Sequence, residues 1–222
     1  MPVTDYLVRN AELYPDEVAL VELNPDEKDT RRTTWKEFDL IQPINNMPYR
    51  REITWSVFNE KANRFANMLL SRGVKKGDKV AILMYNCLEW LPIYFGVLKT
   101  GAIAVPFNFR YDSDEIYYCA ELAQVDVIVF GFAFIGRIEV NAERLSRGRL
   151  LIYVGDNCPS FAESYHELVA DCSSKEPDVK ITEDDYGAIY FSSGTTGFPK
   201  AILHKHQSLT QAAIMEQKHH ST

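Results

Sequence analysis

The sequence predicts an α/β protein in which helices flank a layered, parallel-type sheet. Between residues 80 and 131, short apolar runs typical of buried strands alternate with segments of helical periodicity. Neighbouring parallel strands need a long crossover, usually a helix, so this alternation favours parallel pairing. The chain has 222 residues, of which 46% are hydrophobic, enough to bury a substantial core.

Each element of this fold has a local signal in the sequence. Residues 4–13 show helical spacing, residues 18–21 read as a strand, and an amphipathic helix follows Thr54, with Gly73 as its carboxyl-terminal stop. The pair Asp112 and Glu115 forms a capping-box pattern that starts a further helix. The expected helices of this region cover residues 88–98 and 114–122, and the expected strands begin at Val80, Ala102, Asp126, Leu150 and Tyr186.

Two segments lack such periodicity. Residues 24–51 are rich in charge, Pro and Asn and are expected to form an insertion or long loop. The similar hexapeptides TWKEFD and TWSVFN, at Thr34 and Thr54, also admit an internal repeat, but the first loses its periodicity near Pro43. Residues 171–185 are polar and acidic and are expected to be a surface connection.

Composition excludes several functions. The net charge of −7 and the absence of a basic cluster argue against a nucleic-acid partner. The apolar stretch from Trp90 is interrupted by Pro92, Lys99 and Pro106, so no transmembrane segment is expected, although peripheral membrane contact stays open. Four widely spaced cysteines and a start without signal-peptide features predict a cytoplasmic protein.

The segment SSGTTGFPK, from Ser192 to Lys200, carries the clearest chemistry. Glycines let the main chain approach a ligand, successive N–H groups form an anion-binding nest, and the hydroxyls and the lysine add donors and positive charge. Walker A spacing fails because Pro199 and Ala201 replace the second Gly and the Ser/Thr, and a serine-hydrolase elbow fails at Phe191. A solvated hairpin turn is the alternative.

SSGTTGFPK resembles the phosphate-binding signature of the adenylate-forming superfamily, and residues 53–209 resemble its amino-terminal region almost throughout, including the VPFN segment at Val105. Within that superfamily the sequence is most similar to acyl-CoA synthetases. The resemblance implies that the chain is the amino-terminal portion, residues 1–222, of the large AMP-binding domain, without the carboxy-terminal lid domain. Ser192 and Ala201 stand where Thr and Gly are frequent.

The resemblance implies a two-step reaction on a carboxylic acid, fatty or related. In the first step the carboxylate attacks the α-phosphate of ATP and pyrophosphate is released, with Mg²⁺ assisting. In the second step the acyl group passes to coenzyme A. The residues implied to contact phosphate are Ser192, Ser193, Gly194, Thr195, Thr196, Gly197 and Lys200. His206 matches a frequent family histidine and is either near the active site or a packing residue.

The remaining family signatures are absent from these residues, so this chain alone is expected not to turn over. No spacing of His, Cys and carboxylates predicts a metal site: His204 and His206 alternate on a possible strand, and surface histidines explain them. Two hypotheses from different classes therefore stay open, an ATP-dependent acid–thiol ligase seen in part, and a nucleotide-binding or interaction module without catalysis. A third possibility is an unrelated ATPase or kinase with a different phosphate loop.

Overall fold

The computed structural model describes residues 1–23, 50–192 and 199–220. Its helices are α1 (Val3–Leu13), α2 (Trp55–Ser71), α3 (Trp90–Lys99), α4 (Ser113–Leu122), α5 (Ile135–Glu139), α6 (Ala142–Leu145), α7 (Tyr165–Ala170) and α8 (His206–His220), with a 3-10 turn η1 (Phe132–Phe134). Its strands are β1 (Val18–Leu23), β2 (Arg50–Thr54), β3 (Lys79–Leu83), β4 (Ile103–Pro106), β5 (Val127–Gly131), β6 (Leu150–Val154), β7 (Glu163–Ser164), β8 (Tyr186–Ser192) and β9 (Lys200–Lys205).

Seven of these strands form one sheet in the order β7-β6-β5-β3-β4-β8-β9. All neighbouring pairs are parallel except β8 and β9, which pair antiparallel as a hairpin at the edge. The chain adds β4 on one side of β3 and then crosses to add β5 on the other. The predicted parallel-type α/β sheet is therefore confirmed, and the six parallel strands β3, β4, β5, β6, β7 and β8 end toward one common edge.

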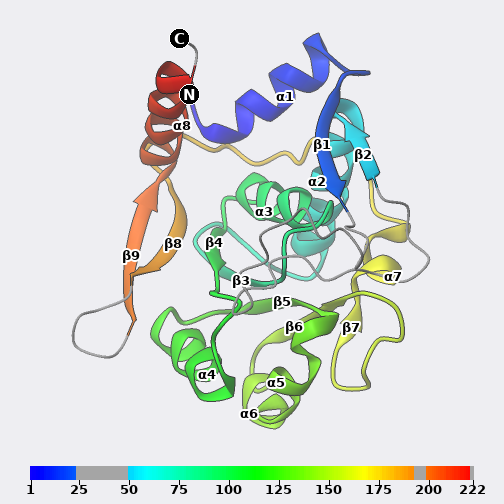
Figure 1. Ribbon diagram of the computed structural model, residues 1–222, viewed down its shortest axis with the longest axis vertical. Helices are drawn as coiled ribbons and strands as arrows, with labels where there is room; N and C mark the ends of the chain where they lie inside the picture. Colours follow the sequence, from blue (N-terminus) through cyan, green and yellow to red (C-terminus); the bar gives the residue numbers. More distant parts are fainter. Residues whose placement is uncertain (24–49, 193–198, 221–222) are drawn as a thin grey trace, which may run out of the picture.

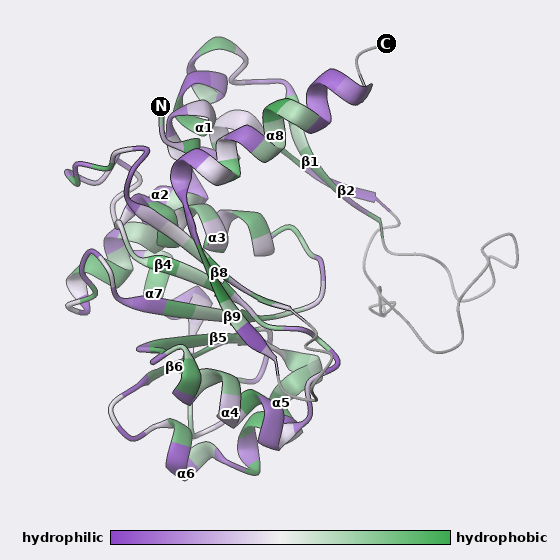
Figure 2. Cartoon of the chain, turned by 90° about the vertical axis from the view of Figure 1, so that its left-hand side faces the viewer, coloured by the Kyte–Doolittle hydropathy of each residue, from purple (hydrophilic) through white to green (hydrophobic). Residues whose placement is uncertain are grey.

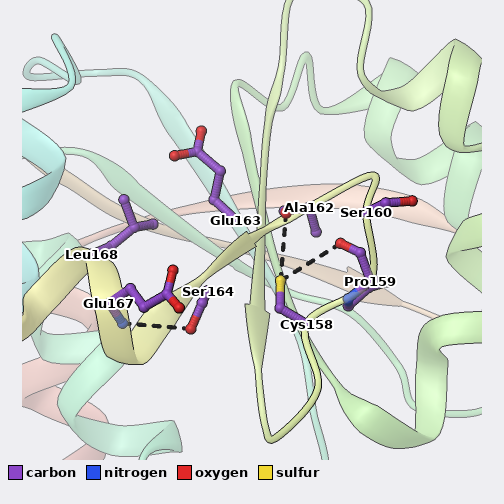
Figure 3. A pocket seen from close by; sticks show the side chains of 8 residues that line it. All are labelled: Cys158, Pro159, Ser160, Ala162, Glu163, Ser164, Glu167 and Leu168. Atoms are coloured by element: carbon purple, nitrogen blue, oxygen red, sulfur yellow. Dashed lines mark hydrogen bonds between the residues drawn. The ribbon is translucent and has the colours of Figure 1, made fainter.

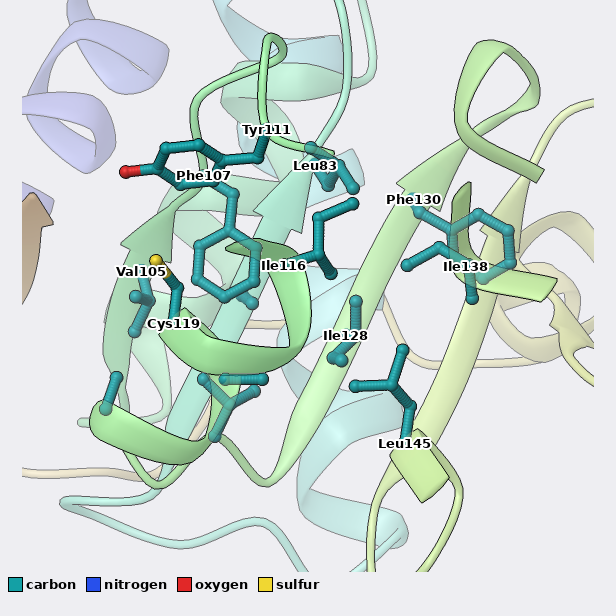
Figure 4. Packing of buried hydrophobic residues seen from close by; sticks show 14 of the residues in the cluster. Leu83, Val105, Phe107, Tyr111, Ile116, Cys119, Ile128, Phe130, Ile138 and Leu145 are labelled. Carbon is teal, nitrogen blue, oxygen red and sulfur yellow. The ribbon is translucent and has the colours of Figure 1, made fainter. Parts of the chain in front are cut away.

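Helices cover both faces of the sheet (Figure 1). Alternate strand residues divide between two apolar clusters, because successive side chains on a strand point to opposite faces. Val80 and Ile82 pack with α2 and α3, whereas Ala81 and Leu83 pack with α4 and the helices that follow β5. Figure 4 shows the second cluster, in which Ile116 and Cys119 of α4 lie over the strands. The core thus comprises two apolar layers separated by the sheet.

Local signals fix where the helices begin and end. The Thr54 hydroxyl accepts a hydrogen bond from the Val57 amide at the start of α2, and Gly73, with φ +85°, follows its end. Asp112 and Glu115 form the predicted capping box of α4, each side chain bonding the other's backbone amide. The helix predicted over residues 88–98 is α3, which begins two residues later.

The structure corrects two of the sequence-based expectations. Arg50 and Arg51 belong to β2, which pairs antiparallel with β1, so they are not part of the expected 24–51 loop, whose residues 24–49 lie outside the described ones. His206 begins helix α8 and does not alternate with His204 on a strand. The short elements β7, α5, α6 and α7 carry no periodicity long enough to be read from sequence.

Figure 2 shows apolar residues gathered on the strands and their covering helices, with the carboxyl end of α8 hydrophilic. The connecting segment (residues 171–185) runs from α7 to β8, thereby linking strands near opposite ends of the sheet. It has no helix or strand, as predicted. Side chains of α2 nonetheless hold it closely: the amides of Asn63 and Asn67 donate to the Ser174 and Ser173 carbonyls at 2.9 and 2.8 Å.

Candidate functional site

The candidate site is the open end of the β8–β9 hairpin. Ser192 ends β8, Lys200 begins β9, and the two residues face each other in the antiparallel register. The intervening segment therefore leaves and re-enters the sheet at a single rung. Of the predicted phosphate contacts, the structure brings these two together; Ser193, Gly194, Thr195, Thr196 and Gly197 lie outside the described residues.

This hairpin end lies at the carboxyl edge of the sheet. Because β8 is parallel to β4, Ser192 lies at the carboxyl edge, to which β3, β5 and β6 also lead. Open α/β sheets bind ligands outside the carboxyl ends of their strands. Ser192 is half-buried and Lys200 is exposed, so the lysine ammonium is available to an anion from solvent.

Phe191 fixes the amino-terminal stem of the hairpin end on one face of the sheet. Its ring lies 5.9 Å from Phe107 and 6.4 Å from Tyr111, both edge-on. Phe107 and Tyr111 belong to the segment that follows β4, which Arg137 secures by donating to the Phe109 and Tyr111 carbonyls at 2.6 and 3.1 Å. The VPFN segment noted in the sequence therefore supports the stem by packing.

His206 occupies a different place. It follows β9 at the end remote from Lys200, roughly 20 Å along a six-residue strand. The side chain is fully buried, and a Cβ on Gly187 would lie 3.2 Å from its ring. Burial lowers its pKa, with Asp185 opposing and Lys76 reinforcing that shift. Neither ring nitrogen has a hydrogen-bond partner among the described residues, and the contacts that the structure shows are those of a packing residue.

A cavity of about 480 Å³ lies farther along the same edge. It is lined by residues that directly follow β3, β5 and β6, such as Tyr85, Phe132 and Gly155, and by the pair Glu22 and Arg51, whose charged groups are 2.6 Å apart. The described lining holds three carboxylates against one guanidinium, which disfavours polyphosphate. No motif in the sequence points to these residues, and only their shared position just after strands could have predicted that they lie together.

Cys87 in this cavity is not a prepared nucleophile. Burial, followed by the nearby charge of Glu89, raises the pKa of its thiol to about 12. A thiol of that kind stays protonated near neutral pH, and the thiolate is the reactive form. The cavity therefore has the features of a binding space and no reactive thiolate.

A second cavity, of about 410 Å³, lies beside the edge strand β7 and is lined by the connection from β6 to β7, by β7 itself and by the start of α7 (Figure 3). The Cys158 thiol lies 3.4 Å from the Ala162 carbonyl oxygen, and the Glu167 amide donates to the Ser164 hydroxyl at 3.4 Å. Partial burial and the carboxylates of Glu167 and Glu163 raise the pKa of the Cys158 thiol. These contacts build a turn and a helix cap and do not point to catalysis.

Two features are absent from the described residues, 1–23, 50–192 and 199–220. Within them no group of three or more His, Cys, Asp or Glu residues is placed to hold a metal ion. No helix within the same ranges is long and apolar enough to cross a membrane.

Comparison with known proteins identifies the family. The profile described as AMP-binding enzyme matches residues 7–221, nearly the whole chain. The chain belongs to the AMP-binding enzyme family. Its curated relatives include the long-chain-fatty-acid–CoA ligase FadD13 of Mycobacterium tuberculosis, 33% identical over 162 residues, which cover 72% of this chain and 31% of that protein. They also include a 3-hydroxybenzoate–CoA/4-hydroxybenzoate–CoA ligase of Thauera aromatica, 31% identical over 76% of this chain and 32% of that protein.

Solved structures of this family agree with the fold. The anthranilate CoA ligase AuaEII, in complex with anthranoyl-AMP, has a TM-score of 0.79 and 25% identity, with 96% of this chain and 36% of that chain covered. The N-terminal domain of FACL13 from Mycobacterium tuberculosis has a TM-score of 0.69 and 25% identity, with 94% and 45% covered. The chain of this AMP-binding enzyme spans about a third of the length of the curated relatives that it matches.

Proposed function

We propose that this chain supplies the ATP phosphate-binding loop of an AMP-forming acid–thiol ligase, an acyl-CoA synthetase. The observation that carries the proposal is the placement of Ser192 and Lys200 on one rung at the carboxyl edge of the sheet, in a chain of the AMP-binding enzyme family. Between them the sequence SGTTGFP provides glycines and hydroxyl donors. Backbone amides, hydroxyls and one ammonium are the donors that suit a polyphosphate.

Each residue of the loop has a proposed role. Gly194 and Gly197 let backbone N–H groups approach the β- and γ-phosphates, and the hydroxyls of Ser192, Ser193, Thr195 and Thr196 add short donors. Lys200 supplies a positive charge that offsets the charge of the departing pyrophosphate. Holding ATP in this way leaves its α-phosphate oriented for in-line attack by a carboxylate, and the acyl-adenylate then passes its acyl group to the thiol of coenzyme A.

Mg²⁺ is compatible with this proposal, because the phosphates of ATP would supply part of its ligands. Mg²⁺ keeps several waters and is usually bound by one or two carboxylates together with substrate phosphates, so a cage of protein carboxylates is not required. When bound, the ion would offset phosphate charge. Among the described residues, Ser192 and Lys200, which pair at the open end of the hairpin, are the ones proposed to bind and orient the phosphates.

We further propose a fatty or related acid as the substrate and the cytoplasm as the location. The relatives act on acids as different as long-chain fatty acids and hydroxybenzoates, which supports the carboxylate class but not one member of it. The four cysteines are free thiols, consistent with a reducing compartment. We also propose that residues 1–222 form the amino-terminal portion of the large domain and do not turn over alone.

The substitution Lys200→Ala tests the phosphate role. A charge-assisted hydrogen bond contributes about 1.5 to 3 kcal/mol, so its loss is expected to weaken the binding of ATP, measured by titration calorimetry, about 10- to 100-fold. Lys205→Ala is the matched control, because Lys205 lies at the other end of β9 and pairs with Asp184 at 3.1 Å. Equal ATP affinity of Lys200→Ala and the wild type would remove the assigned role.

Carboxylate-dependent exchange of pyrophosphate into ATP tests the reaction itself. The measurement compares this chain with the same chain extended to the length of its relatives, over short, long and aromatic acids. Exchange in the longer protein alone is the expected result, and the preferred acid would identify the substrate. ATP binding without exchange in either protein would instead support a nucleotide-binding module without catalysis.

A further inference from the structure

The final residues of β8 have little backbone support from the neighbouring strand β4. The parallel register between β8 and β4 is at Ala188, which faces Ala104. β4 ends two residues later at Pro106, whose nitrogen carries no hydrogen to donate. Tyr190 therefore lies level with the last residue of β4 and Ser192 extends past it, and on their other side both residues pair with the edge strand β9. Side-chain contacts must supply much of what holds this stem.

One face of the stem is held by Phe191, as described above, and the opposite face is held by Tyr190. The hydroxyl oxygens of Tyr190 and Tyr94 are 2.9 Å apart, which makes a hydrogen bond between β8 and α3. The two residues are 96 positions apart in sequence. Alternation along the strands places Ser192 and Lys200 on the same face as Tyr190. The hydrogen bond thus joins the helical layer to the face of the stem that carries Ser192 and Lys200, the two described residues of the proposed phosphate site.

Tyr94 is a fixed support. It is 8% exposed, and its neighbours Ile93 and Val97 on α3 are fully buried. The Trp90 ring stacks on it, with centroids 5.4 Å apart and planes within 13°. Tyr190 is 36% exposed and depends on this contact, with His204 edge-on to its other side at 5.3 Å. The bond therefore connects a rigid residue with the residue two positions before Ser192.

We propose that the hydrogen bond between Tyr94 and Tyr190 is a positioning device that holds Ser192 and Lys200 where they meet the phosphates of ATP. This inference rests on the proposed function. Tyr94 and Tyr190 are positioning residues, because they would act on the phosphates through Ser192 and Lys200 and not by direct contact. The apparent affinity of a site falls in proportion to the fraction of molecules in the competent arrangement. A stem freed from α3 spends less time in that arrangement and binds ATP more weakly.

The test removes hydroxyls and keeps the rings. Tyr94→Phe and Tyr190→Phe are each expected to raise the dissociation constant of MgATP about fivefold, the equivalent of one ordinary hydrogen bond. The double variant is expected to bind as weakly as either single variant, because both substitutions remove the same bond. Backbone amide exchange at Phe191 and Ser192 should become faster in all three variants. All measurements use the 222-residue chain.

Tyr153→Phe is the matched control. The Tyr153 hydroxyl also makes a 2.9 Å hydrogen bond, to the Asp156 carbonyl, at the end of β6 on the same edge of the sheet. Its loss should lower thermal stability as the other variants do but leave ATP affinity unchanged. An equal loss of affinity in Tyr153→Phe would show general loosening of the edge and overturn the inference, as would additive effects in the double variant.

Lys200→Ala separates the two levels of the proposal. If Lys200→Ala binds ATP weakly while Tyr94→Phe and Tyr190→Phe bind as the wild type does, the phosphate role stands and the positioning inference is wrong. If the wild-type chain does not bind ATP, or Lys200→Ala binds equally well, the proposed function fails and the inference fails with it.

Discussion

His206 is a histidine that the fold keeps uncharged. Its ring is fully buried against Gly187. Burial lowers the pKa of His206 and is the largest of three effects; the charge of Asp185 raises the pKa, and that of Lys76 lowers it further. The unfolded chain therefore binds the His206 proton at a higher pH than the folded chain does. The stability linked to this difference is present above the unfolded value of about 6.5 and is lost as the pH falls toward the lower folded value.

We accordingly expect the free energy of unfolding to fall as the pH decreases from about 7 to about 5. His206→Leu removes the titrating ring and should flatten that dependence in urea unfolding curves recorded across the same range. His219→Gln is the control, because His219 is exposed on α8, and it should keep the wild-type slope. A slope unchanged by His206→Leu would mean that other groups cause it.

Residue-scale features differ in how far the sequence reveals them. The caps at Thr54 and at Asp112 with Glu115 were predictable, because each depends on residues three positions apart. The assignment of the segment from Ser192 to Lys200 to phosphate binding likewise rests on one short motif and stays a prediction. The bond between Tyr94 and Tyr190 was not, since it depends on how α3 and β8 meet across the sheet.

Helix packing at Gly96 is the clearest feature at the scale of an element. A Cβ at this position would lie 2.8 Å from the Ala62 carbonyl oxygen and 2.9 Å from the Phe65 ring. The absence of a side chain therefore lets α3 approach α2 closely. In the sequence Gly96 reads as a weak point of a helix, because glycine lowers helix propensity by about 1 kcal/mol relative to alanine.

Gly96→Ala is expected to destabilise the protein by about 1 to 3 kcal/mol, since overpacking outweighs the gain in helix propensity. Gly136→Ala is the matched control in helix α5, where an added Cβ meets nothing within 4 Å. That variant should be neutral or stabilised by up to about 1 kcal/mol. Thermal unfolding of both variants decides the matter, and a Gly96→Ala variant as stable as Gly136→Ala would contradict the packing argument.

The order of elements was also largely predictable, and the exceptions have physical reasons. Alternating strands and helices over residues 80–131 imply parallel pairing, which the sheet confirms. Asn59, Asn63 and Asn67 recur every four residues on α2, a polar stripe whose purpose the sequence did not reveal. The structure shows that the side-chain amides of this stripe donate hydrogen bonds to the connecting segment.

At the scale of the whole molecule, the connecting segment ties the two ends of the sheet together over the helical layer. Its main anchor is Glu176, whose carboxylate accepts from the buried ammonium of Lys99 at 2.6 Å. Burial lowers the pKa of Lys99, and Glu176 opposes that shift. For Glu176, burial raises the pKa, but hydrogen bonds from Lys99, Asn63 and Asn59 outweigh it and lower the pKa.

Glu176→Gln leaves the Lys99 ammonium buried without its counter-charge. We expect a loss of about 1 to 2 kcal/mol in unfolding free energy, less than for a fully buried pair because the Glu176 side chain is 45% exposed. Trypsin cleavage at Lys175 and Lys180 should accelerate. Glu163→Gln, which breaks an exposed pair with Arg72, is the control and should cost less than about 0.5 kcal/mol. Similar losses of unfolding free energy in both variants would contradict the role of Glu176 as an anchor.

The single-rung pairing of β4 with β8 has a consequence for synthesis on the ribosome. Ala104 meets its partner Ala188 only after more than 80 further residues have been made, which takes about 4 to 17 seconds at 5 to 20 residues per second. During that interval β5 and then β6 are synthesised and can pair on the other side of β3, whereas the free edge of β4 has no partner strand. The nascent chain thus exposes an unpaired strand edge for seconds, and a chaperone that covers this edge would act during that interval.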